Sequence, residues 1–383
     1  MVAKNDISDL IRFALTTVFI VLFIVGVAIV AGMLIGRQTL KISVADVTKA
    51  VGYKPKPVKE PLIMNFVGDV MLDRGVEYMV NKYGNGSYNF PFLLVAEELK
   101  ADVVFGNLEG PVSDQGYKAG SIYSFEADPR AIDGLKYAGF NVMSCANNHM
   151  LDYTRAALED TLVRMKNANI LCVGAGMNAA EAGAPKYLDV KGNKIAFLGY
   201  ADFDVPAWLA GEQTSGLARL TAADLENGIQ TARKEGADLV IVSFHFGAEY
   251  EPAANDRQIE WARAAIDKGA DLVIGHHPHV IQPLEEYEAD SKQGALAGTI
   301  KKENVFKFGQ TGEKEEKASN KRGWIVYSLG NFVFDQNFSQ ETMEGGVLEV
   351  KTENGKISDV VLKKAKINSR YQPEIIGQDS KAD

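Results

Sequence analysis

The stretch Gly275-His276-His277-Pro278-His279-Val280 places three imidazoles within four residues. The chain has five histidines in all, and the other two, His149 and His245, also come after apolar, strand-like runs. Histidine is the commonest metal ligand and proton shuttle among side chains. Because no histidine is left for ordinary surface positions, we predict a single site that gathers them, with the rest of the chain as its scaffold.

The composition is that of a globular protein, with 46% apolar and 24% charged residues in a chain of 383 residues. The formal net charge of −9 argues against a nucleic-acid partner, because no basic stripe is present. Cys145 and Cys172 are too few for a disulfide framework. Both lie in apolar runs, so we expect buried small hydrophobic side chains, and the sequence leaves open whether they pair.

A long uncharged segment lies near the N-terminus, at residues 13–35. As a helix it would span roughly 35 Å, enough to cross a bilayer. It is longer than the apolar core of a cleaved signal peptide, so we predict an uncleaved transmembrane signal anchor. Lys54-Pro55-Lys56-Pro57 cannot continue a helix and predicts an extended stalk. We therefore expect a single-pass protein of the bacterial cell membrane, with its large C-terminal domain extracellular.

A repeated unit then fills the globular part: a helical stretch, a short apolar run, and a polar closing motif. Short apolar runs bounded by Gly and Asp are typical of buried strands. Helical segments such as 155–168 and 258–268 lie between them, which indicates βαβ units in an α/β fold. Ligands of such sheets bind beyond the carboxyl ends of the strands, where the closing motifs lie. We therefore expect residues distant in sequence to converge on one rim.

Two further strands are predicted at 194–200 and 324–328. Residues 346–351 and 356–363 flank Asn354-Gly355, a turn signal that predicts an antiparallel edge hairpin. The expected domain organisation is a tail and anchor at 1–36, a stalk at 37–60, a globular domain at 61–368 with an inserted mobile loop at 288–322, and a disordered tail at 369–383.

The side chains expected at the rim mix carboxylate, amide and imidazole groups, which suits Mn, Fe or Zn. The predicted metal ligands are Asp69, Glu109, Asn148, His245, His277 and His279. Taken singly, most of these residues have an ordinary structural explanation, such as a turn residue or a core histidine. Because each explanation would need a separate coincidence at a strand end, we favour a metal site that holds one or two divalent ions and activates water.

Three further residues are candidates for catalysis. His149 follows Asn148 and is placed to donate a proton, and Asp152 could orient it. Asp73 could support the site or cap the following helix. Neighbouring residues of an extended segment point to opposite sides, so we expect His276 to face away from the site and to act behind the metal ligands. The supporting residues predicted for this role are Asn107, Asn147, His276 and Asn331.

The order of these motifs resembles the poly-γ-glutamate capsule biosynthesis (CapA-type) family. The motifs concerned are Gly68-Asp69, Gly106-Asn107-Leu108-Glu109, Ala146-Asn147-Asn148-His149 with Leu151-Asp152-Tyr153, His245-Phe246-Gly247, the opening stretch, and Tyr327-Ser328-Leu329-Gly330-Asn331-Phe332. The resemblance covers about residues 62–367. It implies a calcineurin-like metallophosphoesterase fold, a four-layer α-β-β-α sandwich, preceded here by the transmembrane helix.

The motifs also depart from those of metallophosphoesterases. Met71 stands where an Asp-x-His motif would have its histidine, and Glu109 stands in a motif that usually carries aspartates. Phosphoesterase activity is therefore one hypothesis for a protein of capsule synthesis or export. A non-catalytic platform of the capsule machinery is the alternative, as is a metal-dependent hydrolase of another cell-envelope substrate. The resemblance implies as partners a membrane, other capsule membrane proteins, and polyglutamate or another envelope polymer.

Overall fold

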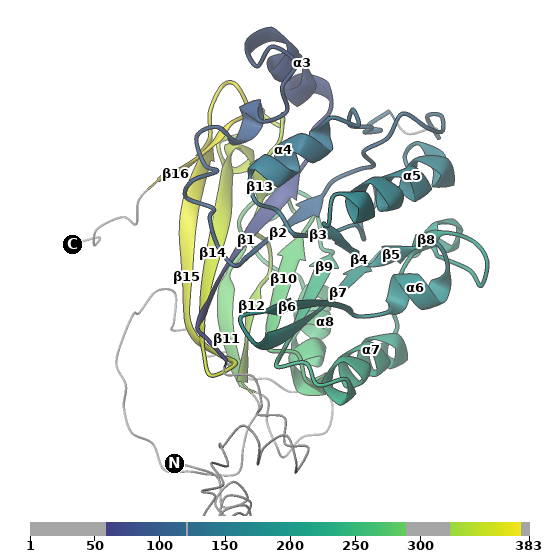
Figure 1. Cartoon of the computed structure of the whole chain (residues 1–383), viewed down its shortest axis with the longest axis vertical. Helices are drawn as coiled ribbons and strands as arrows, with labels where there is room; N and C mark the ends of the chain where they lie inside the picture. Colours follow the sequence, from purple (N-terminus) through teal and green to yellow (C-terminus); the bar gives the residue numbers. More distant parts are fainter. Residues whose placement is uncertain (1–58, 120–121, 289–321, 377–383) are drawn as a thin grey trace, which may run out of the picture. The chain divides into compact units, whose positions relative to one another are not determined.

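Two β-sheets stacked face to face form the centre of the fold, and helices cover the outer face of each (Figure 1). The computed structural model describes residues 59–119, 122–288 and 322–376. These residues belong to one unit that begins at Val58. The α/β class predicted from the sequence is confirmed.

Within the described residues, the larger sheet has eight strands in the order β16-β15-β14-β1-β2-β3-β4, with β13 beside β1. Their bounds are β1 Leu62–Val70, β2 Val103–Leu108, β3 Val142–Ser144, β4 Leu171–Val173, β13 Asn331–Val333, β14 Glu344–Glu353, β15 Lys356–Ile367 and β16 Pro373–Ile376. Strands β1 to β4 are parallel, as the alternation of strands and helices predicted.

The smaller sheet has the order β11-β12-β10-β9-β7-β6, and β5 pairs with β8 apart from both sheets. The bounds are β5 Ala175–Gly176, β6 Lys186–Val190, β7 Asn193–Ala201, β8 Gly216–Leu217, β9 Leu239–His245, β10 Leu272–His276, β11 Leu284–Glu288 and β12 Arg322–Val326. Strands β7, β9, β10 and β12 are parallel, while β6 and β11 run antiparallel at the two edges.

In the part of the chain that the structure describes, the helices are α3 Arg74–Tyr83, α4 Ala131–Tyr137, α5 Thr154–Asn167, α6 Ala179–Gly183, α7 Ala222–Lys234 and α8 Asp256–Lys268. Short 3₁₀ turns occur at Phe90–Phe92, Pro206–Trp208 and Glu341–Met343. Local sequence sets the helix ends. For α8, Asn255 and Gln258 form a capping box, and Gly269 ends the helix at φ 123°, a conformation that favours glycine.

Three buried apolar clusters separate the four layers. One cluster lies between the larger sheet and α3, α4 and α5. The second lies between the smaller sheet and α7 and α8. The third lies between the two sheets and includes Phe66, Phe105, Phe197 and Ile274. On β1, Phe66 faces the other sheet while Val67 faces the helices, which follows from the two-residue period of a strand. The cluster between the sheets therefore keeps the strand ends of the larger sheet close to the strand ends of the smaller sheet.

The antiparallel hairpin around Asn354-Gly355 is present, with both turn residues at positive φ (53° and 74°). It does not lie at the edge of the sheet, because β14 pairs with β1 and β15 pairs with β16. The strand β16 lies in the segment 369–383, which the sequence predicted to be disordered, so that prediction is wrong for residues 373–376. The strand β16 is short and has little periodicity, and its pairing with β15 stabilises it. A sequence pattern within one segment does not reveal such a pairing.

Cys145 and Cys172 form a disulfide, with a Cα–Cα distance of 5.7 Å. The sequence left open whether the two cysteines pair, and the structure shows that they do. The pairing follows from the sheet: β3 and β4 are neighbours, with Met143 opposite Cys172. Sequence spacing alone does not reveal which strands are neighbours.

Some predictions fall outside the described residues. These are the segment 13–35, the stalk up to residue 58, and residues 289–321 of the expected inserted loop. Among the residues that the structure describes, no helix is both long and apolar enough to cross a bilayer. A single-pass membrane protein with an extracellular domain is therefore not supported, and the predicted localisation is corrected on this finding.

Replacing both cysteines by alanine should lower the free energy of unfolding. The disulfide closes a loop with a sequence separation of 27 residues. A loop of that size is worth roughly 3–4 kcal/mol in the chain-entropy account. Urea unfolding of the two proteins checks this, and the difference should largely vanish in reductant. Two free thiols in the unreduced, denatured chain would contradict the pairing.

Replacing Gly68 by alanine should destabilise the fold where the larger sheet meets the site. A Cβ atom on Gly68 would lie 1.9 Å from the backbone oxygen of Gly330. Backbone cannot yield as a side chain can, so we expect a loss of roughly 2–3 kcal/mol in unfolding free energy. Gly183→Ala is the matched control, because a Cβ atom there meets nothing within 4 Å. Equal unfolding midpoints for the two variants would contradict the prediction.

Candidate metal centre

Asp69 lies at the centre of the converging side chains. It lies near the end of β1, where the register of strand pairing shifts. Such irregularities change the direction of side chains and are common beside functional sites. The carboxylate is fully buried. Asn107 Nδ2 donates to its Oδ1 atom at 2.9 Å, and His279 Nδ1 lies 3.2 Å from its Oδ2 atom. Burial alone would raise the pKa of Asp69, but hydrogen bonds and charge from His276 and His279 hold it well below its usual value.

Glu109 follows β2 and is the second buried carboxylate. Asn107 Nδ2 also donates to its Oε2 atom. Its Oε1 atom has no hydrogen-bond partner among the described residues, and His245 Nε2 lies 3.6 Å away. Burial, and next the negative charge of Asp69, raise the pKa of Glu109 well above its usual value. Two carboxylates buried this close together form a natural place for a cation.

His245 ends β9 on the smaller sheet and is fully buried. Its Nε2 atom lies 2.8 Å from Asn148 Oδ1, so the amide predicted as a ligand stands beside the imidazole predicted as a ligand. Burial, and next the charge of His277, lower the pKa of His245 well below its usual value, which keeps the ring neutral. Neutral imidazole is the form that binds metal. One ligand atom each of Asp69, Glu109 and His245 lie within 4.8 Å of one another.

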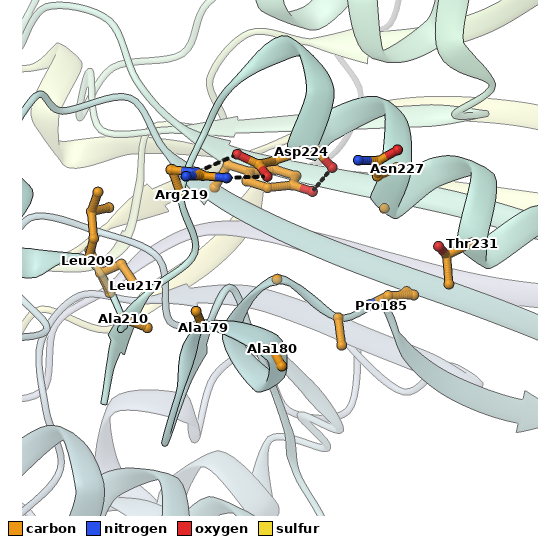
Figure 2. Close-up of a pocket in the computed structure, with 14 residues that line it drawn as sticks. Ala179, Ala180, Pro185, Leu209, Ala210, Leu217, Arg219, Asp224, Asn227 and Thr231 are labelled. Atoms are coloured by element: carbon orange, nitrogen blue, oxygen red, sulfur yellow. Dashed lines mark hydrogen bonds and ion pairs between the residues drawn. The ribbon is translucent and has the colours of Figure 1, made fainter. Parts of the chain in front are cut away.

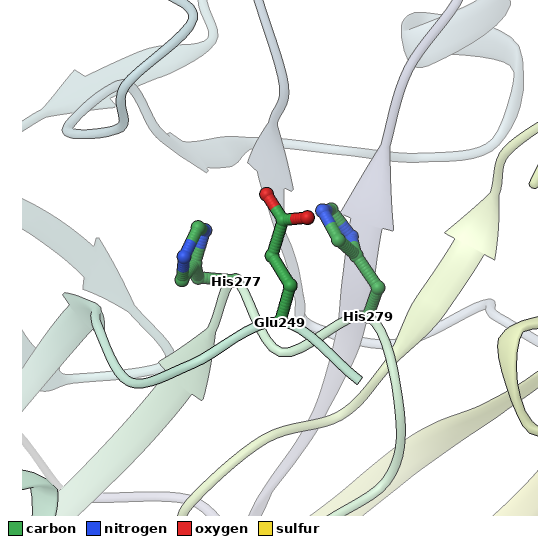
Figure 3. A group of neighbouring side chains, drawn as sticks. All are labelled: Glu249, His277 and His279. Atoms are coloured by element: carbon green, nitrogen blue, oxygen red, sulfur yellow. The ribbon is translucent and has the colours of Figure 1, made fainter. Parts of the chain in front are cut away.

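His277 and His279 follow β10 with their side chains close together, and Glu249 joins them (Figure 3). One ligand atom from each of the three residues lies within 4.8 Å of the others. Burial, and next the charge of His279, lower the pKa of His277 to about 4. Both histidines have positive φ, at 97° and 59°. The argument from an extended segment was therefore wrong here, because β10 ends at His276 and the backbone then turns.

His276 does not face away from the site. It is fully buried against Phe105, with a distance of 6.1 Å between ring centroids, and its Nδ1 atom lies 3.3 Å from Asp69 Oδ1. It thus contacts Asp69, a predicted ligand, and its supporting role stays a prediction. Its contact with Asp69 arises because β1 and β10 lie in facing sheets, a fact that alternation along one strand cannot supply.

The other predicted supporting residues also lie around the carboxylates. Asn147 Nδ2 donates to Asn107 Oδ1 at 3.1 Å and to the backbone oxygen of Leu108 at 2.7 Å. Asn331 Oδ1 lies 3.0 Å from His279 Nδ1. The amides form a connected buried network, which fixes the ligands that they touch.

His149 stands beside this group, with its Nε2 atom 3.9 Å from Glu109 Oε1. Its Nδ1 atom lies 2.7 Å from Asp152 Oδ2, the partner predicted for it. The backbone N–H of Phe125 donates to the same carboxylate oxygen at 2.9 Å, and the Phe125 ring covers the imidazole at 4.1 Å between centroids. The imidazole is thus held on one nitrogen while the other faces the centre.

Asp73 is the predicted catalytic residue that the structure does not bring into the site. It caps α3, with Oδ1 accepting from the Arg74 N–H at 2.6 Å and Oδ2 accepting from the Glu126 N–H at 2.8 Å. Of the two explanations considered for Asp73, the helix cap describes its contacts. Asp73 follows the predicted ligand Asp69 by four residues, which suggested a role in the site. The helix α3 begins directly after Asp73, however, so its side chain caps that helix.

Glu249 was missed by sequence reasoning. It lies four residues after His245, in a short polar stretch with no strand period, and its side chain is exposed. The available signal was an acidic residue soon after a predicted histidine ligand. Its placement depends on how the loop folds, which the sequence pattern does not show.

A separate cavity of about 540 Å³ lies beside α6 and α7 (Figure 2). Its charged lining residues, Arg219 and Asp224, bond to each other at 2.7 and 3.0 Å, and Tyr200 reaches the Asp224 backbone. No histidine lines it, and the candidate metal ligands lie elsewhere, at the ends of the strands.

Comparison with protein families gives a match to "Bacterial capsule synthesis protein PGA_cap" over residues 63–336. Two similar proteins are "Capsule biosynthesis protein CapA" of Bacillus anthracis and "PGA biosynthesis protein CapA" of Bacillus subtilis (strain 168). The first is 35% identical over 301 residues, which is 76% of this chain and 64% of that protein. The second is 34% identical over 327 residues, which is 84% of this chain and 73% of that protein. This chain thus spans less than two thirds of the length of the first relative.

Among solved structures, the calcineurin-like phosphoesterase YfkN from Bacillus subtilis aligns with a TM-score of 0.40 and 12% identity, over 82% of this chain and 93% of that one. The NAD nucleotidase NadN from Haemophilus influenzae aligns with a TM-score of 0.44 and 10% identity, over 84% of this chain and 61% of that one. These likenesses are distant, so the chemistry of this site rests on its own residues.

Replacing Glu109 by glutamine should stabilise the metal-free chain at pH 7 but not near pH 4. The pKa of Glu109 is raised in the folded state. The folded state therefore loses stability as the pH rises above the pKa of glutamate in the unfolded chain, which is about 4.3. The neutral amide escapes this loss, so we expect a gain of at least about 1 kcal/mol at pH 7. Urea unfolding of chelator-treated protein between pH 4 and pH 8 measures it. Glu98→Gln, at an exposed position, is the control. A gain that does not change with pH would contradict the cause.

Proposed function

We propose a function from one premise: this chain belongs to the bacterial capsule synthesis protein family PGA_cap, whose match covers residues 63–336. We infer that it is a metal-dependent hydrolase that takes part in the synthesis of a poly-γ-glutamate capsule. The proposed substrate is a phosphoester, or an amide or ester bond of the capsule polymer. The proposed partners are that polymer and other proteins of capsule synthesis and export.

The observation that carries the proposal is the buried group of Asp69, Glu109 and His245. Two carboxylates and an imidazole are a set that suits Mn, Fe or Zn. Among the described residues, the Oε1 atom of Glu109 is buried without a hydrogen-bond donor, and His245 Nε2 faces it at 3.6 Å. Such atoms are costly unless a cation or a donor satisfies them. The residues therefore fit a divalent ion, with Asn148 beside His245 as a further ligand.

A bound divalent ion in this position would supply Lewis-acid activation of water and of the bond to be cleaved. The chain itself supplies proton transfer. Asp152 holds His149 at Nδ1, so the proton that serves a leaving group is the one on Nε2, which faces Glu109. The Phe125 ring covers one face of this imidazole and excludes water from it.

A platform without catalysis is the second candidate, and one observation favours it. Met71 follows Asp69 by two residues, and its thioether accepts from the backbone N–H of Asp73 at 3.1 Å. It is buried in the apolar cluster under the helices and offers no hard ligand. A site with fewer ligands on that side could serve to bind a polymer without cleaving it.

Metal analysis of the full chain tests the proposal, with His245→Ala, His277→Ala and His149→Ala beside the wild type. We expect near-stoichiometric Mn, Fe or Zn that falls in the first two variants, because each loses an imidazole ligand. The His149→Ala variant should keep its metal but lose at least about 100-fold in the hydrolysis of aryl phosphoesters or γ-glutamyl amides, since it loses only the proton donor.

The outcomes separate the candidates. A folded wild-type chain without tightly bound transition metal would contradict the hydrolase. A metal-loaded chain whose turnover is absent, or is unchanged in His149→Ala, would favour the platform. Circular dichroism of each variant shows whether the fold is retained.

A further inference from the structure

We propose that Glu249 is the carboxylate ligand of a second divalent-cation position, which it shares with His277 and His279. This inference rests on the proposed function, because it adds a second ion beside the one held by Asp69, Glu109 and His245. It assigns a role to a loop residue that no sequence motif identified.

The donor set is the first argument. One ligand atom each of Glu249, His277 and His279 lie within 4.8 Å of one another, and Figure 3 shows the carboxylate directed into the space beside the two rings. Two imidazoles and one carboxylate form a set that holds Zn or Fe with open positions. His277 Nδ1 is buried without a hydrogen-bond partner among the described residues.

Charge is the second argument. His277 and His279 by themselves offer no negative charge to a cation when neutral. Glu249 supplies one, and together with Asp69 and Glu109 the centre then holds three carboxylates. Three negative charges balance most of the charge of two divalent ions. The remainder is positive, which favours an anionic substrate.

The loop after β9 is built to hold Glu249 in place, which is the third argument. The N–H of the next residue, Tyr250, donates to the backbone oxygen of Pro278 at 2.8 Å, so the loop is bonded directly to the segment between the two histidines. Tyr250 adopts a φ of 65°, a left-handed conformation that costs energy for a bulky residue. Its ring packs on His279 at 6.0 Å between centroids.

The base of the same loop is fixed by a buried side chain. Gln282 is 2% exposed, and its Nε2 atom donates to the backbone oxygen of Glu251 at 2.8 Å. Gln258 Nε2 in turn donates to Gln282 Oε1 at 2.8 Å. A Cβ atom on Gly247, whose φ is 100°, would lie 2.5 Å from the Gln258 side chain, so only glycine fits there. The carboxylate is therefore exposed to solvent but mounted on an ordered backbone, as a ligand at an open metal position requires.

The test is a titration of the full, chelator-treated chain with Mn²⁺, followed by calorimetry and by electron paramagnetic resonance. The variants are Glu249→Gln, which removes the charge at nearly constant shape, and Glu251→Gln, an exposed carboxylate of the same loop. We expect the wild type and Glu251→Gln to bind two ions and to show a spin-coupled signal. Glu249→Gln should bind one ion as before, bind the second at least tenfold more weakly, and lose the coupled signal.

Two results would overturn this inference alone. One is a Glu249→Gln variant that binds two ions with wild-type affinity. The other is a wild type that binds one ion, unchanged by Glu249→Gln. A chain that binds no Mn²⁺, Fe²⁺ or Zn²⁺ would overturn the proposed function as well, so the two failures are distinguishable.

Discussion

The burial of two carboxylates side by side is the constraint on which the rest of the structure depends. Asp69 and Glu109 end neighbouring strands of one sheet and are almost fully excluded from water. An isolated buried charge is costly, so each carboxylate needs a donor or a cation. Asn107 bonds to both of them, and the histidines of the other sheet bond to Asp69. Glu109 keeps one oxygen unpartnered within the described residues, which is why we propose a cation beside it.

The two sheets contribute different chemistry to this constraint. The larger sheet brings the oxygen-bearing side chains of Asp69, Glu109 and Asn148, while the smaller sheet and its loops bring His245, His277, His279 and Glu249. Neither sheet holds a complete site. The apolar cluster between them, with Phe66 against Phe105 and Phe105 stacked on Phe197, sets the distance between the two rims. The metal affinity that we propose would therefore depend on the packing of this cluster, because the candidate ligands come from both sheets.

Sequence reasoning named most of the side chains that the structure brings together, and it erred where its assumption of local regularity failed. It identified Asp69, Glu109, His245 and the His149–Asp152 pair because each follows a strand or a short turn whose period is visible. It placed Asp73 in the site, although the chain had already turned into α3. It also expected an extended backbone at His277 and His279, where φ is positive. In each case the residue follows a regular strand in the sequence, but its backbone no longer has the extended conformation of that strand.

The sequence by itself determined the kinds of donor present, their positions at the ends of buried strands, and the α/β class, because apolar period and strand length are local properties. Tertiary structure alone decided which strands are neighbours, and with that the disulfide between Cys145 and Cys172 and the pairing of β16. It also decided that Glu249 stands opposite His277 and His279, since a hydrogen bond from Tyr250 to Pro278 folds one loop onto another. The physical reason is the same throughout: a contact between two segments far apart in the chain produces no periodic pattern of apolar residues in the sequence of either segment.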